Sequence, residues 1–361
     1  MFKRVLQKPD GRLLLLYSAT ALPAELEAPS PPGTPGTGGH LRWHPLRGEW
    51  VAYAAHRQNR TFLPPPEYNP LAPTTDPAVP TELPAGEYDV AVFENLFPTL
   101  SMAASRKLPT ALLPTAPGLG VCEVVVFTQD ATATLGSLPL WHIRLLLDVW
   151  ADRTEALGAL PEVHYVMPFE NRGVEVGVTL HHPHGQIYAY PFIPPIPARE
   201  LQCQKEYLDA NGTGLLQDLL VAELDDGQRV LRADEHVLSF VPACARFPFE
   251  VWVAPRRPVA LLHELEPAER ASLASALKTL LLTYDKMWGR PFPYVMVLHQ
   301  APTDGVAHPE AHLHFEFYPA YRMPGRLKYL AGSELGAGVF TADAEPEAVA
   351  AQLRAAQERL A

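Results

Sequence analysis

The chain has 361 residues, of which 47% are hydrophobic and 19% charged, so it can bury a sizeable core and is not a disordered protein. Its net charge of −11 argues against DNA or RNA as partners, although a local basic pocket could still hold one nucleotide. Three widely spaced cysteines fit neither a disulfide framework nor a CxxC zinc pair, and no apolar run is long enough to cross a membrane, so we expect a cytoplasmic protein.

The first 85 residues predict short strands separated by proline-rich connections. A hairpin is expected over residues 2–17, because two apolar segments flank a turn at Pro9-Asp10-Gly11. Residues 23–39 are rich in proline and glycine, which is typical of a linker or surface loop. A strand pair is predicted over 43–55, and the many prolines of 64–84 argue against any regular element there.

The middle of the chain predicts strands around one long helix. Strands are expected at 88–95 and 122–128, followed by an amphipathic helix capped by Ser137. Two further strands are predicted at 164–171 and 178–190, and the second of them carries several histidines.

The remaining residues repeat this order. The pattern predicts a helix at 199–221, three strands within 228–254, a helix at 266–288, strands at 294–300 and 311–319, and a final helix at 346–360. We therefore expect an α+β protein, mainly antiparallel sheet with helices packed against it, built by structural duplication of one half.

The segment His181-His182-Pro183-His184-Gly185-Gln186 is the most informative motif. Strand alternation predicts that His182, His184 and Gln186 point to one side, beside a glycine where a ligand could approach the backbone. A neutral imidazole is a good nucleophile at phosphorus near pH 7. Spacing alone leaves three readings open: a nucleophile, a metal site and a structural histidine pair. Pro183 lacks a backbone donor, which predicts an edge strand or a local irregularity.

Together with Phe169-Glu170-Asn171-Arg172-Gly173, this motif resembles the active-site signature of galactose-1-phosphate uridylyltransferases, the transferase branch of the histidine triad superfamily. The resemblance covers roughly residues 41–335. It implies two histidine-triad-like halves, at 41–197 with the nucleophile and at 198–361 with a metal site. Residues 1–40 would form an additional hairpin and linker.

The resemblance implies a ping-pong reaction. UDP-glucose would transfer UMP to His184 and release glucose 1-phosphate, and galactose 1-phosphate would then accept UMP to give UDP-galactose. The family's hydrolase relatives carry histidine at the Gln186 position. A glutamine amide can bond a phosphoryl oxygen but cannot supply a mobile proton, which favours transfer over hydrolysis. His182 is expected to orient neighbouring groups. The alternatives are a related nucleotidyltransferase or phosphorylase acting on ADP-glucose or dinucleoside polyphosphates, and a non-catalytic binding module.

Further substrate-binding residues follow from the resemblance by position. They are expected to contact the nucleotide and its phosphates and are Arg57, Arg60, Asn95, Asn171, Gly177 and Thr179. Without the resemblance, the arginines could lie in a solvated loop and the asparagines could cap turns. Lys328 and Glu334 match a segment that reaches the sugar of a neighbouring subunit, which implies a homodimer with shared active sites.

The resemblance also implies metal sites. At the first family site, most of the expected ligands are replaced by residues of Tyr68-Asn69-Pro70-Leu71-Ala72 and by Ala131, so we predict no zinc there. We suggest that the prolines of 64–84 stiffen this loop in place of the metal. The second site aligns with Glu200, His299, His314 and Glu316. Two imidazoles and two carboxylates suit one divalent Zn or Fe ion, and the alternative is a buried hydrogen-bond network without metal.

Overall fold

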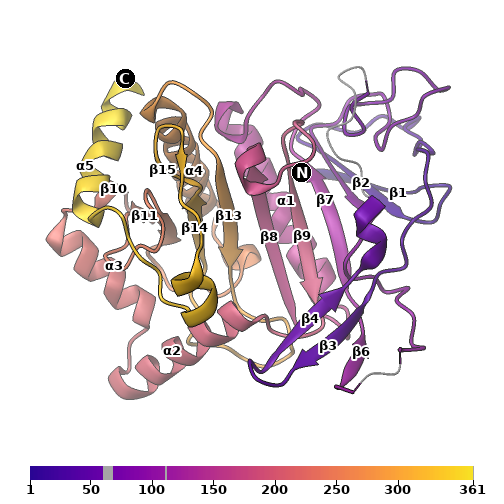
Figure 1. The fold of residues 1–361 in the computed structure, drawn as a ribbon. Coiled ribbons are helices and arrows are strands. Elements are labelled where there is room, and N and C mark those ends of the chain that lie inside the picture. Colours follow the sequence, from indigo (N-terminus) through magenta and orange to yellow (C-terminus); the bar gives the residue numbers. More distant parts are fainter. Residues whose placement is uncertain (60–67, 110–111, 361) are drawn as a thin grey trace.

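The computed structural model describes residues 1–59, 68–109 and 112–360, and these residues build one large antiparallel sheet (Figure 1). The order across the sheet is β1-β2-β5-β7-β9-β8-β13-β14-β12-β11-β10. The strands of this sheet, in chain order, are β1 (Phe2–Gln7), β2 (Leu13–Ser18), β5 (Val90–Glu94), β7 (Val121–Val126), β8 (Tyr165–Arg172), β9 (His184–Tyr190), β10 (Val230–Ala233), β11 (Val237–Phe240), β12 (Val251–Pro255), β13 (Tyr294–His299) and β14 (His314–Pro319).

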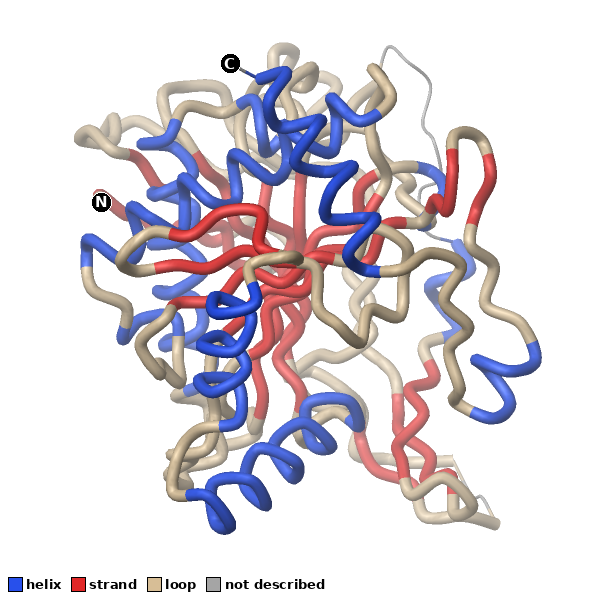
Figure 2. The backbone as a smooth tube through the Cα atoms, turned by 90° about the vertical axis from the view of Figure 1, so that its left-hand side faces the viewer, coloured by secondary structure: helices blue, strands red, loops and turns tan. Residues whose placement is uncertain are grey.

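Helices cover both faces of the sheet. On one face α1 (Leu140–Gly158) and α4 (Pro267–Met287) pack against the strands, and α5 (Pro346–Gln357) packs on α4. On the other face α3 (Leu215–Asp226) packs on β11 and β12, and α2 (Pro195–Asn211) contacts α3 and reaches β13 through a hydrogen bond between Glu200 and His299. Seen from the side, the strands run through the middle of the molecule and the helices lie outside them (Figure 2). The face over β8 and β9 is therefore left open to a ligand.

Smaller elements complete the described chain. A three-stranded sheet has the order β4-β3-β6, and β15 pairs with β16. None of the helices in the described ranges is both long and apolar enough to cross a membrane. The bounds of these strands and of the short helical turns are β3 (His40–His44), β4 (Glu49–Tyr53), β6 (Thr115–Pro117), β15 (Tyr321–Met323), β16 (Arg326–Leu327), η1 (Ala55–Asn59), η2 (Leu135–Ser137), η3 (Val174–Val176), η4 (Leu262–Glu264), η5 (Ser333–Ala337) and η6 (Glu358–Leu360).

The two halves meet where β8 pairs with β13, with Phe169 opposite Val297. Outward from this junction the order is β9, β7, β5 on one side and β14, β12, β11 on the other. One long helix from each half, α1 and α4, packs into a shared apolar core. The predicted α+β class with mainly antiparallel sheet is confirmed, and the repeated strand order agrees with a duplicated half.

Two local predictions about helices are wrong. Ser137 does not cap α1: it closes the short turn η2, where its backbone N–H donates to Thr134 Oγ1 (3.2 Å), and α1 begins after Pro139 with no side-chain cap. The single helix expected at 199–221 is two helices. Gly212 ends α2 in the left-handed region (φ 75°), which a glycine adopts without the steric cost of a side chain.

The strand expected over 178–190 is shorter than predicted. It begins at His184, so Pro183 lies just before the strand and removes no donor from its ladder. β9 is accordingly not an edge strand but lies between β7 and β8. His182 falls outside the strand, and the alternation that was expected to align it with His184 does not apply to it.

The N-terminal hairpin is tied to the proline-rich loop 68–84 through buried charges. Lys8 contacts the Glu82 carboxylate and donates to the Glu82 carbonyl oxygen (2.8 Å), and its side chain is completely buried. Arg12 Nη2 lies 3.0 Å from a Glu82 carboxylate oxygen and 2.8 Å from Asp10. Buried charges are tolerated when they are paired in this way. The hairpin therefore holds the loop in place.

We expect Glu82→Gln to lower the free energy of unfolding by about 3 kcal/mol, because Lys8 would stay buried without its carboxylate partner. Urea denaturation measures this change. Glu25→Gln, at an exposed position of the following segment, is the matched control and should leave stability unchanged. Equal stability of the two variants would contradict the anchoring role of Glu82.

Candidate active site

The alternation of β9 places its polar residues on the open face of the sheet. Gly185, Ile187 and Ala189 are buried, whereas His184 and Gln186 are half-buried on the opposite side. A Cβ on Gly185 would lie 2.8 Å from the Phe169 carbonyl oxygen. The glycine thus permits close packing of neighbouring strands, and the approach of a ligand to the backbone there stays a prediction.

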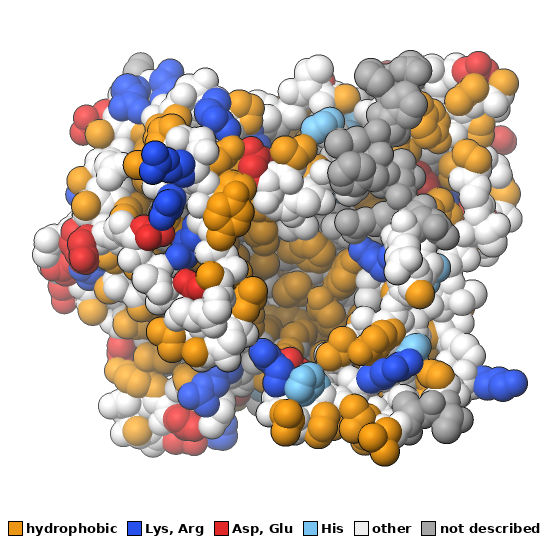
Figure 3. Space-filling view, viewed as in Figure 1, with side chains coloured by type: hydrophobic (Ala, Val, Ile, Leu, Met, Phe, Trp, Pro, Cys, Tyr) orange, Lys and Arg blue, Asp and Glu red, His pale blue; other side chains and the backbone are white. Residues whose placement is uncertain are grey.

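His184 and Gln186 line a cavity of about 340 Å³, which we call the His184 cavity. The space-filling view shows a hollow near the middle of the open face, with hydrophobic side chains on its floor (Figure 3). Segments far apart in the sequence converge here. The predicted substrate-binding residues that line the cavity are Arg57, Asn95, Asn171, Gly177 and Thr179.

One ring nitrogen of His184 is held by the backbone. The distance from Nδ1 to the His182 carbonyl oxygen is 2.7 Å, and because a carbonyl only accepts, Nδ1 carries the proton and donates. Burial lowers the pKa of His184 below its usual range. At neutral pH the ring is therefore neutral, with the lone pair on Nε2, which is the form that can attack phosphorus.

His182 occupies a different position from the predicted one. It does not line the His184 cavity but is almost completely buried beside it. Its Nε2 lies 2.7 Å from the Thr128 carbonyl oxygen, and its Nδ1 lies 2.9 Å from Asn69 Nδ2. Its backbone carbonyl oxygen accepts the hydrogen bond from His184 Nδ1, and a role of His182 in orienting neighbouring groups stays a prediction.

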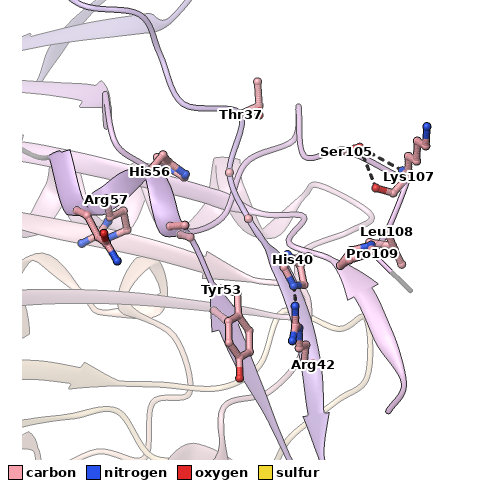
Figure 4. A pocket seen from close by; sticks show the side chains of 16 residues that line it. Thr37, His40, Arg42, Tyr53, His56, Arg57, Ser105, Lys107, Leu108 and Pro109 are labelled. Carbon is pink, nitrogen blue, oxygen red and sulfur yellow. Dashed lines mark hydrogen bonds between the residues drawn. The ribbon is translucent and has the colours of Figure 1, made fainter. Parts of the chain in front are cut away.

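Arg57 extends from η1 to the rim of the cavity. Its Nη1 donates to the Phe97 carbonyl oxygen (2.7 Å) and lies 3.4 Å from the Tyr188 hydroxyl. It also borders a larger open depression of about 1020 Å³, in which Arg42 bonds to His40 and lies over the Tyr53 ring (Figure 4). Arg57 thus adds positive charge to the cavity that His184 also lines.

Two further predictions concern neighbouring residues. Arg60, which was predicted to bind phosphates together with Arg57, lies outside the described residues. Asn95 Oδ1 accepts a hydrogen bond from the Phe97 backbone N–H (2.8 Å). Asn95 therefore both caps a turn and lines the cavity, and the two interpretations of this asparagine are compatible.

Some cavity residues were not foreseen. Tyr188 follows Gln186 in the alternation of β9, so the strand pattern could have identified it. Pro31 and Pro32 also line the cavity, although they precede the segment in which the motifs occur. Nothing in their local sequence indicates a ligand site.

Lys328 and Glu334 lie together but not in the His184 cavity of this chain. Lys328 Nζ is 3.7 Å from a Glu334 carboxylate oxygen, and both side chains are largely buried in the segment after β16. Their predicted contact with a sugar would thus have to be made in another subunit.

A second cluster of polar side chains, two histidines and two glutamates, lies in the C-terminal half of the sheet, beyond the β8–β13 junction. One ligand atom from each of Glu200, His299, His314 and Glu316 can be chosen so that all lie within 4.8 Å of one another. Glu200 comes from α2, and the two histidines face each other across β13 and β14. Two imidazoles and two carboxylates in a buried setting fit a divalent metal ion. The predicted ligand set is therefore brought together by the fold.

Comparisons with known proteins show what the whole chain is similar to. Residues 36–194 match the family described as "Galactose-1-phosphate uridyl transferase, N-terminal domain", and residues 200–358 match its C-terminal domain. A galactose-1-phosphate uridylyltransferase from Thermotoga maritima is 37% identical over 323 residues, covering 87% of this chain and 97% of the relative. One from Rattus norvegicus is 35% identical, covering 88% of each chain. A solved structure described as "Structure of uridylyltransferase" has a TM-score of 0.80 at 34% identity, covering 89% of this chain and 99% of the other.

Proposed function

Because the chain belongs to the galactose-1-phosphate uridylyltransferase family, we propose that it transfers UMP from UDP-glucose to galactose 1-phosphate through a covalent intermediate on His184. The observation that carries this proposal is the hydrogen bond from His184 Nδ1 to the His182 carbonyl oxygen. It leaves Nε2 as the only nitrogen of this ring with a lone pair, in a cavity lined by a basic residue and several amides.

The first half-reaction forms a bond from Nε2 to the α-phosphorus of UDP-glucose and breaks the bond between that phosphorus and the bridging oxygen. Glucose 1-phosphate leaves with the bond electrons. In the second half-reaction a phosphate oxygen of galactose 1-phosphate attacks the same phosphorus, and the histidine departs as a neutral imidazole. The products are UDP-galactose and the original enzyme.

Gln186 is proposed to stabilise the phosphoryl group. It stands two residues after the nucleophile on the same side of β9, and its amide can donate to a phosphoryl oxygen. An amide cannot deliver a proton to a leaving group or take one from water. A sugar phosphate leaves without such help, so this residue favours transfer to a phosphate over hydrolysis.

The nucleotide is proposed to occupy the rest of the His184 cavity. Arg57 and Arg60 would bind phosphates, Asn95 the uracil and ribose, and Asn171 and Thr179 the phosphates near His184, where Gly177 leaves room. The alternative substrate is an ADP-sugar or a dinucleoside polyphosphate. Half-reactions with UDP-glucose and ADP-glucose distinguish the two, since only the accepted donor loads the histidine.

We propose that residues 1–40 form an N-terminal addition, 41–197 the half with the nucleophile and 198–361 the half with a metal site. The matched family domains, at 36–194 and 200–358, support this division. A cytoplasmic homodimer is proposed, in which Lys328 and Glu334 serve the partner's hexose site. No nucleic acid is proposed as a partner, given the net charge of −11, and no membrane, given that no apolar segment of the sequence is long enough to span one.

For the metal we propose one divalent zinc or iron ion, held by Glu200, His299, His314 and Glu316. Such an ion would fix α2 against β13 and β14. We propose no zinc at the first family site, where the resemblance leaves His182 as the one matching ligand position. Its Nδ1 accepts from Asn69, its Nε2 faces the Thr128 carbonyl oxygen, and Ala131 offers no ligand atom.

We expect intact-mass measurement after addition of UDP-glucose to show a UMP-sized adduct on wild-type protein and none on His184→Gly. His181→Ala, at the exposed neighbouring histidine, is the control and should still form the adduct. Galactose 1-phosphate should then remove the adduct and yield UDP-galactose. An adduct on the His184→Gly variant would contradict the assignment of the nucleophile. In a second assay with radiolabelled galactose 1-phosphate, absence of label from UDP-galactose would contradict the hexose assignment.

We expect elemental analysis of purified protein to find about one zinc or iron ion per chain, and His314→Ala to lose it together with several degrees of thermal stability. His308→Ala is the control, because that ring bonds to Asp304 and Glu310 outside the cluster. Two ions per chain would contradict the absence of zinc at the first site.

A further inference from the structure

Both ring nitrogens of His182 have defined partners. The Thr128 carbonyl oxygen can only accept, so the nitrogen facing it, Nε2, carries a proton (2.7 Å). In a neutral imidazole the other nitrogen, Nδ1, must then be an acceptor. Its neighbour is Asn69 Nδ2, an amide donor, at 2.9 Å. The contacts select one tautomer of His182.

The orientation of the Asn69 amide is fixed independently. Asn69 Oδ1 accepts a hydrogen bond from the Leu71 backbone N–H (3.0 Å), so a flipped amide would put two donors together there. It would also put an oxygen against the lone pair of His182 Nδ1. The direction of donation therefore runs from Leu71 to Asn69, from Asn69 to His182 and from His182 to Thr128.

His182 also contacts the nucleophile through its backbone, because its carbonyl oxygen accepts the hydrogen bond that His184 Nδ1 donates (2.7 Å). We propose that Asn69 is a positioning residue: by holding the ring of His182, it holds the His182 carbonyl where it orients His184 for attack. This inference rests on His184 being the uridylyl acceptor. Asn69 itself touches no reacting atom.

The second half of the molecule provides an internal comparison. There His312 Nε2 lies 2.8 Å from the Pro255 carbonyl oxygen, and His314 Nδ1 lies 2.8 Å from the His312 carbonyl oxygen. The hydrogen bonds of His182 Nε2 to a carbonyl oxygen and of His184 Nδ1 to the His182 carbonyl oxygen are thus repeated in the second half. However, His312 Nδ1 is buried and has no hydrogen-bond partner within the described residues. The first half, which carries the proposed nucleophile, differs because the Asn69 amide donates to the corresponding nitrogen, His182 Nδ1.

The loop that presents Asn69 is held at several points. Thr74 Oγ1 donates to the Leu83 carbonyl oxygen (2.8 Å), and Thr81 Oγ1 donates to the Ala72 carbonyl oxygen (2.6 Å). The Glu82 N–H donates to the Pro70 carbonyl oxygen (3.0 Å), and the Glu82 carboxylate is paired with Lys8 and Arg12. A donor on a loop fixed in this way can hold a buried ring without ordering cost at each turnover.

The tautomer is measured on the wild-type protein by ¹⁵N NMR of the histidine rings at neutral pH. We expect His182 to be neutral with its proton on Nε2, and His184 to be neutral with its proton on Nδ1. A His182 ring protonated on Nδ1, or on both nitrogens, would overturn the proposal without any variant.

The role of the amide is tested in single-turnover uridylylation of Asn69→Leu, which keeps the size but not the donor, and Asn69→Asp, which presents an acceptor. We expect Asn69→Leu to slow the half-reaction by about 10- to 100-fold, with the KM for UDP-glucose within about threefold of wild type. Asn69→Asp should be at least as slow, with His182 doubly protonated in the NMR spectrum.

Asn211→Leu is the matched control, because Asn211 bonds to the Tyr207 carbonyl oxygen at the end of α2, and it should keep the wild-type rate. Thermal melts confirm that each variant is folded. A folded Asn69→Leu variant with the wild-type rate would overturn the proposal. Adduct formation by the wild-type protein tests the nucleophile separately, so the two inferences can fail independently.

Discussion

One hydrogen bond determines what the rest of the site can do. An imidazole attacks phosphorus through only one nitrogen, so the other must hold the proton and be fixed as a donor. In this protein a backbone carbonyl provides that fixation: His184 Nδ1 donates to the His182 oxygen. The ring lies at the first position of β9, a strand paired on both sides. Pairing within the sheet therefore fixes the backbone of His184, and the His182 carbonyl oxygen fixes the orientation of its ring.

The duplicated architecture uses the same local geometry for two purposes. His184 and His314 each begin a strand, and each ring is held by the carbonyl two residues before it. The residue two positions later is Gln186 in the first half and Glu316 in the second. An amide suits a phosphoryl oxygen, whereas a carboxylate next to two imidazoles suits a metal ion. The two halves thus share a backbone arrangement and differ in the side chains that it presents.

The N-terminal hairpin and the proline-rich loop form a support for the first site. The hairpin adds β1 and β2 to the sheet, and its Lys8 and Arg12 reach Glu82 in the loop. Pro31 and Pro32 of the following segment line the His184 cavity. Residues that precede the matched family domain therefore contribute to the cavity wall and to the anchoring of Asn69.

Much of this protein is determined by sequence alone. Alternation along a strand was sufficient to place His184 and Gln186 on one face, and the resemblance to the family identified the histidines and carboxylates of the second cluster. Only the tertiary structure decided where the His182 side chain points, that Asn69 lies beside it, and that the N-terminal segment contributes to the cavity wall. The reason is physical: periodicity reports which side of an element a residue faces while that element lasts. It cannot report where a strand begins, nor which distant loop brings a donor to a buried ring.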